Sequence, residues 1–172
     1  NYHISLGFDN IHIYKNDWDY NINKKHVTEI PISGRNKQIT AYNHYLKNSK
    51  SDWAAFIDID EFIVIKSYKD IKSFIESIGV GYTSIVMNWV IFGDSGSDLD
   101  EYDYVIDRFN MRSKTSNEHV KSIIKVGAGL FITNPHCTDG QWIDSNNKTG
   151  YGPFNKNGPT DQIYINHYFT KT

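Results

Sequence analysis

Cysteine is almost absent from this sequence, in which Cys137 is the single one among 172 residues. One cysteine excludes a disulfide within the chain and a zinc site built from cysteines. We interpret Cys137 as a plain thiol beside a turn, because a reactive thiol needs special surroundings. The lack of disulfide pairs also makes secretion less expected, so we expect a cytoplasmic protein.

An excess of charge of one sign is missing as well, because 18 Lys and Arg residues stand against 20 Asp and Glu residues, a net charge of −2. Surfaces that follow nucleic-acid phosphates are normally basic, so we expect no nucleic-acid partner. No stretch approaches the ~20 apolar residues of a membrane span, and no signal peptide is visible. We therefore expect no membrane segment in this chain.

Hydrophobic residues make up 39% and aromatic residues 15% of the chain, which is typical of a globular domain. We expect a single domain over residues 1–172. Its first half alternates between strand and helix patterns, which predicts an α/β fold with a mostly parallel sheet and flanking helices. The predicted strands cover 9–16, 26–32, 53–59 and 83–93, and the predicted helices cover 36–49 and 68–78.

The second half is rich in short strand patterns and in loops of Gly, Asn and Pro. The patterns predict short strands over 102–110, 120–126, 128–136 and 162–169, which we expect to include antiparallel additions to the sheet. Long polar loops cover 93–98, 138–150 and 152–160. Loops of this kind at the end of an α/β domain tend to carry substrate contacts.

Three acids interrupt the apolar run "DWAAFIDIDEFIVI", residues 52–65. Asp58 and Asp60 stand two apart, so in a straight strand both side chains point to the same side. Two adjacent carboxylates repel each other and resist desolvation, and a divalent cation removes that penalty. Mg²⁺ and Mn²⁺ prefer oxygen ligands and also bind substrate phosphates, so the pair predicts a metal bridge to a phosphorylated ligand. Strand-end caps or solvated turn acids are the alternative for the pair, and we interpret Glu61 as a supporting or salt-bridging acid.

Five sequence blocks together resemble glycosyltransferase family 92 and its bacterial and viral relatives. They are the glutamine of "QITAYNHYL", W-x-x-F-I-D-x-D-E-F in "WAAFIDIDEFIVI", N-W-x-x-F-G-x-x-G in "MNWVIFGDSG", "NPH", and N-H-Y-x-x-K in "INHYFTKT". The resemblance implies a Rossmann-like GT-A fold, although relatives carry a first strand and a C-terminal extension without counterparts here. It also implies metal-dependent transfer of a sugar from a nucleotide-diphosphate sugar, most often a UDP-sugar, to a glycan or other hydroxyl acceptor.

The resemblance further implies roles for individual residues. Asp58 and Asp60 match the pair that holds Mn²⁺ or Mg²⁺ on the diphosphate, and His167 matches a late histidine of the metal site, with a core histidine as the alternative. The residues expected near the nucleotide are Arg35, Asn36 and Gln38. Those expected on the acceptor side are Trp89, Phe92, Gly93 and Gly96, for which a core aromatic pair and a glycine turn are the alternative. His136 of "NPH" is expected on the same side, and a turn histidine is its alternative.

An inverting enzyme needs a carboxylate base within hydrogen-bond reach of the acceptor hydroxyl. Asp94 is the predicted base, and Asp98 and Asp161 are alternatives; a solvated turn acid is the plainer interpretation of each.

Two other functions compete with transfer. One is a degenerate transferase domain that only binds a glycan, a nucleotide or a protein. The other is a phosphatase of the haloacid dehalogenase type, whose G-D-x-x-x-D motif resembles "GDSGSD" at 93–98. In that type, however, the D-x-D opens the fold and is followed by Thr or Val, whereas Phe62 stands at that place here.

Overall fold

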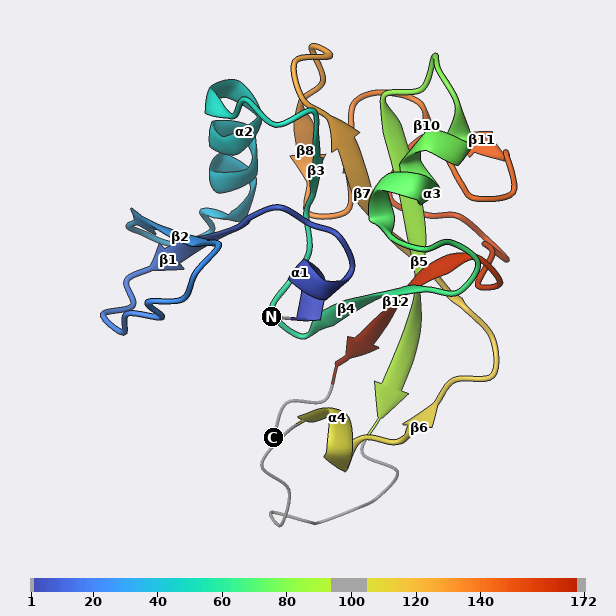
Figure 1. Ribbon diagram of the computed structural model, residues 1–172, viewed down its shortest axis with the longest axis horizontal. Coiled ribbons are helices and arrows are strands. Elements are labelled where there is room, and N and C mark those ends of the chain that lie inside the picture. Colours follow the sequence, from blue (N-terminus) through green and yellow to red (C-terminus); the bar gives the residue numbers. More distant parts are fainter. Residues whose placement is uncertain (1, 94–104, 170–172) are drawn as a thin grey trace.

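The structure, a computed structural model, describes residues 2–93 and 105–169 (Figure 1). The helices are α1 (Tyr2–Ser5), α2 (Gln38–Asn48), α3 (Ile71–Ile78) and α4 (Val105–Arg108). The strands are β1 (Ile11–Asn16), β2 (Val27–Ile32), β3 (Trp53–Ala55), β4 (Glu61–Ile65), β5 (Ser84–Gly93), β6 (Met111–Arg112), β7 (Asn117–Lys125), β8 (Ile132–Asn134), β9 (Cys137–Thr138), β10 (Trp142–Ile143), β11 (Thr149–Gly150) and β12 (Ile163–Tyr168).

The long strand β5 is the centre of an eight-stranded sheet. It runs parallel to β12 and β10 and antiparallel to β7 and β6. The outer pairs, β12 with β4, β7 with β3 and β10 with β11, are all antiparallel. The predicted α/β class is therefore confirmed, whereas the predicted mostly parallel sheet is wrong, because this sheet is mixed.

The error begins where one strand was predicted over 53–59. The strand there is shorter, since β3 ends at Ala55, and a second strand, β4, begins at Glu61. The pairings place β3 parallel to β5 and β4 antiparallel to it. A turn can reverse the chain within a few residues, whereas parallel neighbours need a crossover of about a dozen residues or more. The chain therefore turns back over 56–60 and forms β4, instead of leading from the predicted strand directly to the next helix.

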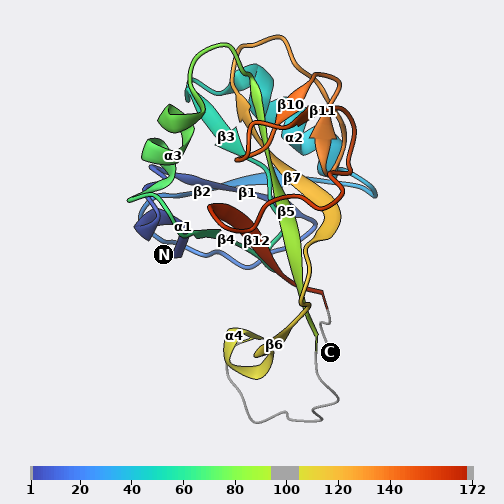
Figure 2. The ribbon, with the colours of Figure 1, turned by 90° about the vertical axis from the view of Figure 1, so that its right-hand side faces the viewer.

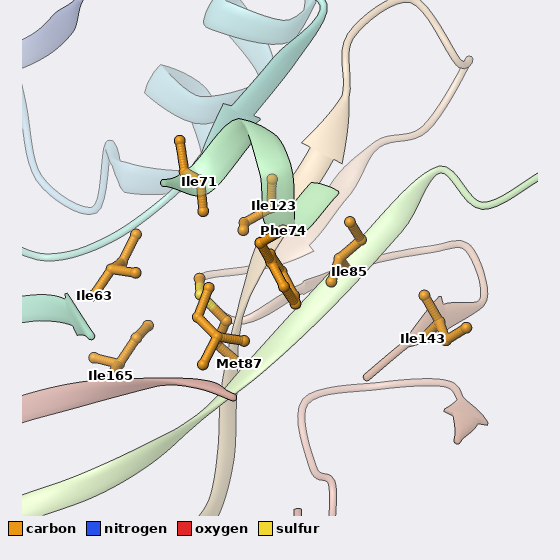
Figure 3. Close-up of a cluster of buried hydrophobic side chains, with 9 residues drawn as sticks. Ile63, Ile71, Phe74, Ile85, Met87, Ile123, Ile143 and Ile165 are labelled. Carbon is orange, nitrogen blue, oxygen red and sulfur yellow. The ribbon is translucent and has the colours of Figure 1, made fainter. Parts of the chain in front are cut away.

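Hydrophobic clusters cover both faces of the sheet. The larger cluster joins α3 to five strands and contains Ile63, Ile71, Phe74, Ile85, Met87, Ile123, Ile143, Ile163 and Ile165 (Figure 3). The smaller cluster sets α2 against β3, β7 and β8 and contains Ala54, Phe56, Ile124 and Ile132. Ile123 and Ile124 belong to different clusters, and adjacent side chains of a strand point to opposite faces. Helix α3 therefore covers one face and α2 the other.

Helix α3 has a clear beginning in the sequence. The Asp70 carboxylate accepts a hydrogen bond from the Ser73 backbone N–H at 2.8 Å, and the Ser73 hydroxyl lies 3.1 Å from the Asp70 backbone N–H. This reciprocal capping box satisfies donors that a helix start leaves unpaired. The helix predicted over 68–78 consequently begins at Ile71.

Two parts of the fold stand apart from the main sheet. Strands β1 and β2 form their own parallel pair beside α2, where the Tyr14 hydroxyl lies 2.8 Å from Nδ1 of His44 (Figure 1). The second part is helix α4, which lies beyond the carboxyl end of β5, next to β6, the strand of the main sheet that pairs with β5 there (Figure 2). The strand predicted over 102–110 is wrong for the described residues, because 105–108 form α4. None of the described helices is long and apolar enough to cross a membrane.

Replacing Gly158 by alanine is expected to destabilise the fold by about 1–3 kcal/mol. An added Cβ would overlap the side-chain amide of Asn88. That amide is buried and donates to the carbonyls of Asn117 and Asn155 at 2.9 and 2.8 Å, so it has little freedom to move. Urea unfolding measures the change, and the matched control is Gly93→Ala, whose Cβ would meet nothing within 4 Å. Equal stability of the two variants would contradict this account of the loop.

Candidate active site

The acids that interrupt the apolar run form a turn. The backbone N–H of Glu61 donates to the carbonyl of Asp58 at 3.2 Å, which closes a four-residue turn between β3 and β4. Ile59 at its tip is 88% exposed, contrary to the prediction of a buried strand up to residue 59. A neighbouring strand also holds this turn, because the backbone N–H of Tyr168 in β12 donates to the carbonyl of Asp60 at 3.0 Å.

An open cleft of about 410 Å³ lies above this turn. Its lining brings together residues from both halves of the sequence: Gln38, Asp58, Asp60, Trp89, Pro135, His136, His167 and Phe169. Carboxylates and an amide form one part of this lining, and rings form the other. The cleft has a size common for small-molecule sites, for which about 300–1,000 Å³ is usual.

The carboxylate of Asp58 is held by three neighbours. Its Oδ1 accepts from Nε2 of Gln38 at 2.5 Å and from the Tyr42 hydroxyl at 3.3 Å. Its Oδ2 accepts from Nζ of Lys121 at 2.9 Å, and the Lys121 side chain is completely buried. Lys121 on β7 thus supplies a positive charge beside Asp58, and the binding of a cation by Asp58 stays a prediction.

Glu61 lies beneath Asp58 and is also completely buried. Its Oε2 accepts from the Asp58 backbone N–H at 2.8 Å and lies 3.6 Å from Nζ of Lys121. Its Oε1 has no hydrogen-bond partner among the described residues. Burial raises the pKa of Glu61 to about 7, and the Asp58 charge adds to this, while Lys121 opposes it. The two acids thus share one ammonium group, and the buried Glu61 has a raised pKa.

Glu61→Gln is expected to remove a pH dependence of stability. The folded-state pKa of about 7 lies above the ordinary value of 4.5, so the folded protein binds the extra proton between these values. Stability from this group is therefore present below pH 4.5 and is lost as the pH rises to 7, by at most about 3 kcal/mol. Urea unfolding at pH 5 and pH 8 should show a smaller loss for the variant than for the parent. Parallel pH curves for the two proteins would contradict the buried acid.

Asp60 and His167 face each other in the cleft, with Oδ2 and Nε2 3.6 Å apart. Burial lowers the pKa of His167 below its usual value, while Asp60 and Asp58 oppose the shift, so the imidazole is neutral at pH 7. A neutral imidazole and a carboxylate are both metal ligands. Because Mg²⁺ binds ligand atoms at about 2.0–2.1 Å, one ion can touch two atoms up to about 4 Å apart. The pair therefore fits a metal ion.

The protein supplies only part of a coordination sphere here. Within 2–93 and 105–169, no three His, Cys, Asp or Glu side chains are grouped closely enough to hold a metal by themselves. Hydrogen bonds from Gln38, Tyr42 and Lys121 use most of the acceptor capacity of the Asp58 carboxylate, which favours Asp60 and His167, 3.6 Å apart, as the ligands. Mg²⁺ commonly binds in this way, through one or two side chains, with water and substrate phosphates as the other ligands.

Rings from neighbouring strands form the rest of the cleft. The centroid of the Trp89 ring lies 4.2 Å from that of His167 and 5.1 Å from that of His136. His136 stands in the tight turn between β8 and β9, where its carbonyl accepts from the Ser122 hydroxyl at 2.8 Å and its Nδ1 lies 3.0 Å from the carbonyl of Val120. Burial lowers the pKa of His136, so this ring is also neutral at pH 7.

Comparison with known proteins agrees with the sequence blocks. The family model of glycosyltransferase family 92 matches residues 32–139, which is more than half of the chain. The chain belongs to glycosyltransferase family 92. No curated protein sequence matches it. The part that matches family 92 contains Asp58, Asp60, Trp89 and His136, whereas His167 follows it.

Several residues that the resemblance to family 92 implied lie away from the cleft. Arg35 and Asn36 are exposed in the connection before α2, and of this group only Gln38 is part of the cleft lining. Phe92 stacks on Tyr168 instead, with ring centroids 4.8 Å apart. Gly93 ends β5 outside the lining. The remaining implied residues, Asp94, Gly96 and Asp98, lie outside the described residues, and Asp161 is exposed outside the lining.

Sequence reasoning missed three residues that line this cleft or lie next to it. Lys121 carries a signal that could have found it, because a lysine within "VKSIIKV" interrupts an apolar strand as the acids do in theirs. A charge in a buried strand needs a partner, and the opposite charges of the two strands suggest the pairing. Phe169 and His119 carry no such signal, since aromatic and histidine residues are common in strands.

Proposed function

We propose that this family 92 domain transfers a sugar from a nucleotide-diphosphate sugar, with a UDP-sugar as the donor class, to a hydroxyl group of a glycan or other acceptor. The observation that carries the proposal is the cleft in which Asp60 and His167 face each other beside Trp89 and His136. Polar ligands for a charged donor and rings suited to a sugar thus share one cavity. A phosphatase finds no support in the family match.

Mn²⁺ or Mg²⁺ is part of this proposal. Asp60 and His167 would hold it, as their spacing of 3.6 Å permits. When bound, such an ion stabilises the charge that develops on a departing nucleoside diphosphate. Asp60 is fixed for this task by the backbone bond from Tyr168, and His167 by its place in β12 between β4 and β5. The two side chains therefore need little rearrangement on binding.

Asp58 has a different part in the proposal. Because Lys121 neutralises it from below, its carboxylate adds little net negative charge to the cleft, and a diphosphate can approach. Gln38 and Tyr42 fix its orientation, and its side chain keeps 35% of its surface exposed for contact with the donor. Asp94 remains the proposed base for the acceptor hydroxyl.

Thermal unfolding with UDP and Mn²⁺ tests the donor site. Ligands that bind only the folded state raise stability by about 2.7 kcal/mol at a free concentration 100 times Kd. We expect a clear rise in Tm when UDP and Mn²⁺ are present together and a smaller one with either alone, since each supplies ligands for the other. Release of nucleoside diphosphate from a panel of nucleotide-sugars with Mn²⁺ then tests transfer. No shift at millimolar UDP and Mn²⁺ would reject the donor site.

A binding domain without catalysis is the second candidate. Its support is the occupation of both Asp58 oxygens by protein groups, which leaves two side chains, rather than three, for a metal. This candidate predicts a Tm shift with a nucleotide or a glycan but no released diphosphate at any acceptor concentration. The same two measurements therefore separate it from the transferase.

A further inference from the structure

A row of rings crosses three neighbouring strands beside the cleft. Trp89 on β5 lies between two histidines, with its centroid 5.1 Å from that of His119 on β7 and 4.2 Å from that of His167 on β12. Phenylalanines extend the row at both ends, with Phe154 4.8 Å from His119 and Phe169 5.7 Å from His167. His167, Trp89 and Phe169 line the cleft, whereas His119 and Phe154 continue the row outside it.

Phe154, the outer ring of this row, is partly exposed to solvent. Phe154 forms an isolated β-bridge with His119 and so lies beside β7. Its side chain is 47% exposed, although the next residues of β7 are buried. The backbone N–H of the next residue, Asn155, donates to the carbonyl of Glu118 at 2.7 Å, and the Asn155 side chain is buried. The backbone therefore fixes Phe154 in place on both sides, and its exposed face is a built feature of the surface.

His119 is fixed between the outer ring and the cleft. Its backbone N–H and its Nδ1 both bond to Oδ1 of Asn117, at 2.9 and 2.8 Å. Because Oδ1 is an acceptor, Nδ1 is the donor of this bond, and Nε2 of the same ring is then an acceptor. The ring stacks on Trp89 with an angle of 20° between planes. His119 thus offers an apolar face and an acceptor nitrogen next to Phe154.

This combination suits a sugar unit. A pyranose ring has faces of C–H groups and a rim of hydroxyl groups, so it needs aromatic surface and hydrogen-bond acceptors together. The cleft shows the same pairing, with Trp89 and Phe169 in the same lining as Asp60 and Gln38. Exposed apolar surface that adjoins a cleft marks a binding site more often than isolated exposed residues do. Since Phe154 lies outside the cleft lining, a ligand that reaches it must extend beyond the cleft.

We propose that Phe154 and His119 form an outer sugar subsite, so that the acceptor is a glycan of at least two sugar units. The inference rests on the proposed transferase function, which places the acceptor sugar in the cleft. The first unit lies in the cleft beside Trp89 and Phe169, and the next unit stacks on the exposed face of Phe154. A free monosaccharide fills only the first of these places.

Ligand-detected NMR with the whole chain tests the outer subsite without any turnover. The probes are the methyl glycosides of glucose, galactose, mannose and N-acetylglucosamine, and the linear di- and trisaccharides built from them. We expect at least one oligosaccharide to bind more tightly than its monosaccharide. Phe154→Leu, which keeps apolar volume without a ring, should remove this preference, a loss of about fivefold for one stacking contact. Phe154→Trp should keep it, because the variant retains an aromatic face.

The matched control is Phe131→Leu, because Phe131 is 65% exposed and lies outside both the cleft lining and the row. This control should retain the parent's preference for length. Three outcomes would overturn the subsite: no oligosaccharide of the panel binds better than its monosaccharide, Phe154→Leu leaves the preference intact, or Phe154→Leu weakens UDP and not the saccharides. If UDP and Mn²⁺ do not raise Tm but oligosaccharides still bind more tightly than monosaccharides, transfer is rejected and the outer subsite is supported.

Discussion

Replacing Asp60 by asparagine is expected to lower the rate of sugar transfer at least about 100-fold and to abolish the joint effect of UDP and Mn²⁺ on Tm. The amide is neutral and cannot match a carboxylate as a ligand for a hard cation. Asp60 is the better of the two aspartates for this task, because it lies 3.6 Å from His167, the other proposed ligand, whereas Asp58 forms an ion pair with Lys121. The measurements are initial rates of diphosphate release and thermal unfolding with UDP and Mn²⁺.

The control for this prediction is Asp52→Asn, which changes an exposed aspartate at the start of the same segment. Its rate and its ligand-dependent Tm should match the parent. Asp58→Asn gives a further contrast, because it removes the partner of a buried ammonium group and should lower stability even without ligands. A variant of Asp60 that keeps both the joint shift and the rate would refute the assignment of the metal to Asp60 and His167.

Apolar periodicity located the two longer helices but was misleading about the turn that carries the acids. Helices predicted over 36–49 and 68–78 are present as α2 and α3, because their apolar periodicity reflects the faces they bury. The predicted strand over 53–59 failed because apolar spacing cannot distinguish a continuous strand from two strands joined by a turn. Ile59 gave the false signal: it is a β-branched apolar residue, and it stands exposed at the tip of that turn.

The charges of the candidate site show a second limit of prediction from sequence. The segment "DID" by itself carries two negative charges, which predicts a cation to balance them. The balancing charge comes instead from Lys121, which is 63 residues away from Asp58 in sequence. Such pairs are set by strand pairing, since β7 lies between β3 and β5 and brings Lys121 opposite Met87. Long-range pairing of this kind is not contained in spacing or periodicity, so the charge balance was visible only in the fold.

Lys121→Met is expected to be the most destabilising single change at the site, by about 3–5 kcal/mol at pH 8. Methionine fills a similar volume, so the loss comes mainly from charge. The side chains of Lys121 and Glu61 are both completely buried, and Asp58 is partly buried, so the variant leaves two carboxylates without their ammonium group. Removing a partner from a buried ion pair costs more than the pair itself contributes, because the remaining charge is poorly solvated. Urea unfolding at fixed pH measures the loss.

The pH dependence of this loss identifies its cause. In the parent, Glu61 has a folded-state pKa of about 7, held down by Lys121 against burial, and without Lys121 this pKa rises further. Both folded proteins carry a protonated Glu61 below pH 7. Above pH 7, Glu61 of the parent ionises beside Lys121, whereas Glu61 of the variant must keep its proton or be charged without that ammonium group. The gap in stability should therefore widen from pH 5 to pH 8 by up to about 1.4 kcal/mol, because pH 8 lies about one unit above the parent's pKa. Lys125→Met, an exposed lysine of the same strand, should change stability by less than about 0.5 kcal/mol at either pH. A loss equal at pH 5 and pH 8 would assign the effect of Lys121→Met to packing and contradict the shared ammonium group.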